Sequence, residues 1–109
     1  MDVRVTSRHC SISDTLRRRA SDRLEGLQRF EPTLSAADVR FASDHGSALA
    51  EVRLLCRGST LQASAAADSF HAAFESAAER AERQLRRHRE RVTDHKAAAA
   101  AVQPPTVIP

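Results

Sequence analysis

Residues 68–96, DSFHAAFESAAERAERQLRRHRERVTDHK, have the spacing of one long amphipathic helix. Most of the hydrophobic residues recur three and four positions apart, which places them on a single stripe facing a core. These residues are Phe70, Phe74, Ala77, Ala78, Ala81, Leu85 and Val92. Either Asp68 or Ser69 can cap the helix at its N-terminus. The stretch therefore predicts a helix with a thin hydrophobic seam and a broad polar surface.

The polar surface of this helix is rich in arginine. At about 100° per residue, the arginines fall on both flanks of the hydrophobic stripe. One flank carries Arg80, Arg87 and Arg91, with Arg83 just beyond it, and the opposite flank carries Arg86 and Arg89. Two interpretations remain open from this pattern. Either the polar surface is exposed to solvent and forms Glu–Arg ion pairs at three- and four-residue spacing, or it is a face that binds a polyanion.

Composition narrows the class of protein. A chain of 109 residues suits one domain, and the low aromatic content of 4% predicts an aliphatic, alanine-rich core. Lys+Arg total 17 against 14 for Asp+Glu, a net charge of +3, and Lys96 is the single lysine. Guanidinium groups bind phosphate in a planar, bidentate way that ammonium groups do not.

Catalytic, metal and cofactor sites have little support in the sequence. Cys10 and Cys56 form neither a disulfide framework nor a metal-binding spacing, and the histidines are scattered. The adjacent His9 and Cys10 have the residue types of a nucleophile pair, but no motif surrounds them. Without a glycine-rich phosphate loop, a signal peptide or a membrane span, we expect a cytoplasmic, non-enzymatic protein with no cofactor and no membrane partner.

The first part of the chain predicts a strand and a helix. Residues 2–6 alternate apolar and polar side chains, as a half-buried strand does, and residues 7–11 form a connection. Ser13 is the predicted N-cap of a helix over residues 14–29, and Pro32 prevents its continuation. The hydrophobic face of this helix consists of Leu16, Ala20, Leu24 and Leu27, and its outer surface carries Arg17, Arg18, Arg19, Arg23 and Arg29.

Three further strands separate the two helices. Residues 37–41, 49–56 and 60–65 alternate in the same way, with a turn at residues 44–47 and a tight hairpin at residues 57–59. The predicted fold is therefore α+β: strand, helix, three strands, helix. We expect a four-stranded sheet whose last three strands are antiparallel, with both helices packed on one face.

The chain divides into a folded domain over residues 1–96 and a tail over residues 97–109. The tail begins with five alanines that can extend the helix, and prolines dominate its end. It is either a plain tail or the beginning of a linker. If the helices lie side by side, their arginines merge into one surface without interleaved aromatic side chains, which favours recognition of structured RNA by its backbone and shape.

Several segments of the sequence resemble the ribosome hibernation promoting factor family, which includes the ribosome-associated inhibitor A proteins. The segments are residues 3–9 (VRVTSRH), 12–17 (ISDTLR), 23–30 (RLEGLQRF), 63–65 (ASA) followed by Asp68, 72–75 (AAFE), 82–89 (ERQLRRHR) and 93–95 (TDH). The ordered set spans residues 1–96, although no single motif is diagnostic.

This resemblance implies a fold similar to double-stranded-RNA-binding domains and a role in ribosome hibernation. It implies binding to the small ribosomal subunit and its rRNA, in the channel used by mRNA and tRNA, with inhibition of translation under stress or in stationary phase. The RNA-binding positions that it implies are Arg23, Arg29, Arg80, Arg83, Arg86, Arg87, Arg89 and Arg91. His9 matches by motif, without an assigned role.

Two alternatives stay open beside this hypothesis. One is a generic module that binds structured RNA away from the ribosome, using the same basic surface. The other is a protein-interaction domain that uses the exposed face or an edge of the sheet. A plain RNA duplex and self-association in the absence of RNA are the tests that separate them.

Overall fold

The computed structural model describes the backbone of residues 1–101 and the side chains of residues 1–90. Its elements follow the predicted order, strand, helix, three strands, helix. They are β1 (Asp2–Arg8), α1 (Asp14–Phe30), β2 (Leu34–Asp44), β3 (Ser47–Cys56), β4 (Ser59–Ala67) and α2 (Phe70–Ala101). Arg91, one of the predicted RNA-binding residues, therefore has its backbone within α2 and its side chain outside the described residues.

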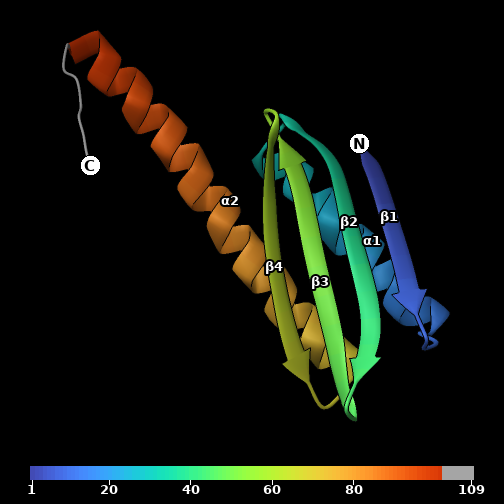
Figure 1. The fold of residues 1–109 in the computed structure, drawn as a ribbon. Helices are drawn as coiled ribbons and strands as arrows, with labels where there is room; N and C mark the ends of the chain where they lie inside the picture. Colours follow the sequence, from blue (N-terminus) through green and yellow to red (C-terminus); the bar gives the residue numbers. More distant parts are fainter. Residues whose placement is uncertain (102–109) are drawn as a thin grey trace.

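The four strands form one sheet in the order β1-β2-β3-β4. β1 is parallel to β2, and the pairs β2–β3 and β3–β4 are antiparallel. Figure 1 shows both helices on the same face of this sheet, with α2 running past its end. α1 covers β1 and β2, whereas α2 covers β3 and β4. The opposite face is open, so the predicted two-layer α+β architecture is confirmed.

The core is aliphatic and rich in alanine, as predicted. The four predicted apolar residues of α1 are all buried, as are those of α2 from Phe74 to Leu85. Small side chains let α2 lie close to the sheet, and Phe41 of β2 fills the space beside Phe70, with ring centroids 5.9 Å apart. Val92, the last member of the predicted stripe, lies outside the described side chains.

Element boundaries are where the prediction was wrong. The predicted connection at residues 7–11 begins too early, because Ser7 and Arg8 still pair with Phe41 and Ala42 of β2. A parallel partner strand supplies their backbone hydrogen bonds, so these exposed residues need no hydrophobic alternation to remain in the sheet. β2 is also longer than the predicted residues 37–41, because its two ends pair with the antiparallel strand β3.

The structure also places both helix starts. The Ser13 hydroxyl accepts a hydrogen bond from the Leu16 backbone N–H at 3.1 Å, which confirms the predicted cap of α1. At α2 the capping residue is Ser69, not Asp68, because its hydroxyl accepts a hydrogen bond from the Ala72 N–H at 3.1 Å. α2 also continues through the five alanines to Ala101, the extension that the sequence allowed.

Candidate nucleic-acid interface

The predicted arginines with described side chains all belong to the helical layer, but they occupy three different environments. Some line the groove between α1 and α2, one lies along the free edge of β4, and the rest point to solvent. This division follows from the helical period. The flank of α2 that includes Arg86 and Arg89 faces α1, whereas the flank that includes Arg80 and Gln84 faces the β4 edge.

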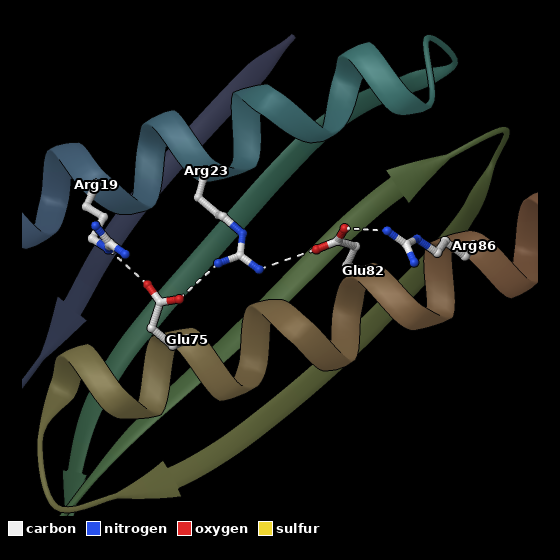
Figure 2. A network of polar contacts seen from close by, with 5 residues as sticks. All are labelled: Arg19, Arg23, Glu75, Glu82 and Arg86. Carbon is white, nitrogen blue, oxygen red and sulfur yellow. Dashed lines mark hydrogen bonds and ion pairs between the residues drawn. The ribbon is translucent and has the colours of Figure 1, made fainter.

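The groove between the helices holds a chain of alternating charges, which we call the inter-helix network (Figure 2). Glu75 binds the guanidinium groups of Arg19 at 2.9 Å and Arg23 at 3.0 Å. Arg23 also reaches Glu82 at 3.3 Å, and Glu82 in turn binds Arg86 at 3.2 Å. Arg23 thus bridges two carboxylates of α2, and the network joins the middle of α1 to the first half of α2.

The network reduces the positive charge that its arginines present to another anion. Three guanidinium groups share two carboxylates, so the positive charge of the groove is largely neutralised. A hydrogen bond from Arg19 holds the pKa of Glu75 below its ordinary value, against the opposing effect of burial, and the charge of Arg23 adds to the lowering. Exposed ion pairs contribute little individually, but this shared arrangement fixes the arginine side chains in one geometry.

Phe30, the last residue of α1, is covered by two arginines of α2. The guanidinium carbons of Arg86 and Arg89 lie 5.7 Å and 4.9 Å from the centre of its ring. Arg89 also donates a hydrogen bond to the Phe30 carbonyl oxygen. Because the C-terminus of a helix carries partial negative charge, cations are favourable there. These arginines therefore stabilise the end of α1 as well as contributing charge to the surface.

The free edge of β4 is covered by side chains of α2. Arg80 donates to the Ser64 carbonyl at 2.7 Å, and Gln84 donates to the Gln62 carbonyl at 2.8 Å. Unpaired carbonyls on an edge strand invite pairing with another chain, so this cover protects the edge. Arg80 is exposed and uses one N–H group on the Ser64 carbonyl, so its other N–H groups remain available to a ligand.

Arg29, Arg83 and Arg87 form the part of the predicted set that is directed to solvent. All three are exposed, and none makes a hydrogen bond or ion pair with another residue that the structure describes. Arg83 and Arg87 are one helical turn apart on α2, about 6 Å along the axis. Arg18 of α1, which was outside the predicted set, is in the same situation. Within the helical layer, these residues are well placed to bind an anion.

Sequence reasoning did not predict the inter-helix pairing of Glu75 and Glu82. Glu75 and Glu82 are seven residues apart, two turns of α2, and lie on one flank of that helix. Arg19 and Arg23 are four residues apart, one turn of α1, and likewise share one face. The available signal was that each pair recurs on a single face of its helix. Of the Glu–Arg pairs expected within α2, the described residues include one, between Glu82 and Arg86.

Other kinds of site have little support in the described residues. They contain no group of three or more His, Cys, Asp or Glu side chains close enough to hold a metal ion. Cys56 is fully buried, and His9 is exposed with a left-handed backbone, φ 57°. Neither helix has an apolar stretch, within its described part, long enough to cross a membrane.

Comparison with known proteins gives a consistent result. The model of the family described as sigma 54 modulation protein / S30EA ribosomal protein matches residues 3–93. A curated relative, the ribosome hibernation promotion factor of Rhizobium meliloti, is 32% identical over 104 residues, covering 87% of this chain and 51% of the relative. The chain thus spans about half the length of that relative.

Two solved structures share the fold. One is a ribosomal subunit interface protein from Coxiella burnetii, with a TM-score of 0.76, 21% identity, and coverage of 83% of this chain and 99% of that one. The other is the N-terminal domain of Protein Y from Thermus thermophilus, with a TM-score of 0.71, 23% identity, and coverage of 81% and 99%. At these identities the likeness establishes the fold alone.

Proposed function

This chain belongs to the sigma 54 modulation protein / S30EA ribosomal protein family, and we propose on that premise that it binds the small ribosomal subunit in the channel used by mRNA and tRNA. Bound there, it inhibits translation in the cytoplasm and promotes ribosome hibernation under stress or in stationary phase. It does so by occupying a site, without catalysing a reaction. The name of the Rhizobium meliloti relative, ribosome hibernation promotion factor, supports this proposal.

The observation that carries the proposal is the set of solvent-directed guanidinium groups on the helical layer. Arg29, Arg83 and Arg87 have no competing carboxylate among the described residues, and exposed phosphates of folded rRNA are suitable ligands for them. The inter-helix network supports this surface by holding α1 and α2 side by side. The proposed set is completed by Arg23, Arg86 and Arg89 between the helices, by Arg80 at the β4 edge, and by Arg91 further along α2.

The aromatic residues point to the kind of RNA contact. The chain has four phenylalanines and neither tyrosine nor tryptophan. Phe41 and Phe74 are buried, and Phe70 is half-buried against Phe41. The ring of Phe30 is covered by Arg86 and Arg89. Base stacking on single strands therefore has no platform among these side chains, so binding depends on backbone phosphates and on the shape of folded RNA.

The test is co-sedimentation with purified small subunits, combined with inhibition of translation in vitro. We expect the chain to sediment with empty subunits, to be displaced by mRNA and tRNA, and to lose affinity steeply as salt rises. A plain RNA duplex is the control. Equal affinity for the duplex and the subunit, or binding that mRNA and tRNA do not displace, would contradict a specific site in the channel.

A further inference from the structure

The turn between β3 and β4 contains an arginine in an unusual backbone conformation. Arg57 and Gly58 have φ values of 54° and 79°, so both central residues are left-handed, as in the tight hairpin turns that favour Asn-Gly. Arginine seldom occupies the first of these positions, because its side chain disfavours positive φ. The turn alone therefore does not account for an arginine at this place.

Glu31 brings the Arg57 side chain towards the end of α1. The Glu31 side chain is 2% exposed, and one of its oxygens lies 3.9 Å from Nη2 of Arg57. The Thr33 backbone N–H donates to the same oxygen at 3.1 Å, and the Thr33 hydroxyl also donates to it. These Thr33 hydrogen bonds are the main cause that holds the pKa of Glu31 below its ordinary value, opposed by burial and assisted by the charges of Arg57 and Arg89.

Two further arginines converge on the same place. Phe30, which precedes Glu31, has Arg86 and Arg89 over its ring. Guanidinium groups from the hairpin and from α2 therefore surround the two residues Phe30 and Glu31, which we call the α1 corner. Three guanidinium groups meet two carboxylates there: Glu31, which is already bound by Thr33, and Glu82, which binds Arg86 and is shared with Arg23. The net charge of the corner is positive, and 41% of the Arg57 side chain is exposed.

We propose that Arg57 is a further phosphate-binding residue, which extends the basic surface of α2 across the tip of the β3–β4 hairpin. The ligand is the phosphate backbone of RNA, in keeping with the proposed function on which this inference rests. Glu31 acts as a positioning residue: its buried carboxylate pairs with the Arg57 side chain, which is 41% exposed and so keeps N–H groups available to a ligand.

The variant that tests this is Arg57→Asn. Asparagine suits the left-handed position, so the turn is preserved while the charge is removed. His45→Asn is the matched control, because His45 and Gly46 form the equivalent turn between β2 and β3, with φ values of 50° and 83°. Arg57→Lys is a second control that retains the charge. We expect each folded variant to melt within about 5 °C of the wild type.

The readout is the dependence of binding on salt concentration, measured with small subunits and with a plain RNA duplex. Loss of one phosphate contact lowers the magnitude of the slope of log K against log salt by about 0.9. We expect this reduction for Arg57→Asn, with no reduction for His45→Asn and most of the slope retained by Arg57→Lys. An Arg57→Asn slope and affinity equal to those of the wild type would overturn the inference.

The two RNA ligands separate this inference from the proposed function. If the wild type prefers small subunits and Arg57→Asn binds them equally well, the inference fails and the proposed function stands. If the wild type binds subunit and duplex equally and Arg57→Asn weakens both, the proposed function fails and the inference stands. A wild-type chain that binds neither ligand contradicts both.

Discussion

Replacing Arg83 and Arg87 together by alanine should weaken RNA binding while leaving the fold intact. Both residues are exposed on α2, and neither has an ion pair or hydrogen bond among the described residues. Surface substitutions of this kind change the free energy of unfolding by no more than about 0.5 kcal/mol. Alanine is also the better helix former, so the small change should be neutral or stabilising.

The size of the binding effect follows from the number of phosphate contacts removed. If each guanidinium neutralises one phosphate, the slope of log K against log salt should be smaller in magnitude by about 1.8 for the double variant. Between 50 and 200 mM salt the wild type should then lose about twelvefold more affinity than the variant loses over the same range. The assay is co-sedimentation with small subunits across a salt series, with thermal unfolding followed by circular dichroism in parallel.

A matched control is available on the same exposed strip of α2. Glu79 and Glu90 are exposed and likewise have no partner among the described residues. Glu79→Gln/Glu90→Gln should keep the slope and raise affinity slightly, because it removes negative charge near the proposed phosphate contacts. The reasoning is refuted if the arginine double variant keeps the wild-type slope, or if it unfolds much more easily, since the latter result would mean that these residues are structural.

Three further predictions concern the stability and association of the domain. The pKa values of Glu31 and Glu75 are lowered from the ordinary 4.5, so their contribution to the free energy of unfolding is present above about pH 4.5 and is lost as pH falls through their folded pKa. Urea unfolding between pH 3 and 7 should show this decline in stability, and Glu75→Gln should make the decline shallower. Phe74→Ala should lower the free energy of unfolding by about 3–5 kcal/mol, because the ring is fully buried; a loss below 1 kcal/mol in urea titration would contradict this packing. Gln84→Ala uncovers the Gln62 carbonyl on the β4 edge and should increase self-association at high protein concentration, measured by analytical ultracentrifugation; an unchanged monomer fraction would mean that the cover is dispensable.

The sequence was most informative where local rules act alone. The spacing of Phe74, Ala77, Ala81 and Leu85 predicted the buried stripe of α2, and Ser13 predicted the start of α1. These features depend on the helical period and on hydrogen bonds between neighbouring residues, both of which are visible in a short segment.

Features that depend on the distance between elements were less predictable. The sequence predicted Arg23 on the outer surface of its helix. Whether Arg23 forms an ion pair depends on how closely α1 approaches α2, and in the structure it pairs with Glu75 and Glu82. The extension of β1 to Arg8 depends on its parallel partner strand. The sequence predicted Arg57 only as part of a tight turn. Its ion pair with Glu31 connects two segments that are distant in the sequence, so no local pattern indicated it.

The central claim is that the helical layer, and not the open face of the sheet, contacts ribosomal RNA. The most direct measurement is a cryo-EM map of the chain bound to the small subunit. The account predicts α1 and α2 facing rRNA in the mRNA and tRNA channel, with the Arg83 and Arg87 guanidinium groups against phosphates. A map in which the open sheet face lies on the RNA while both helices face solvent would contradict it.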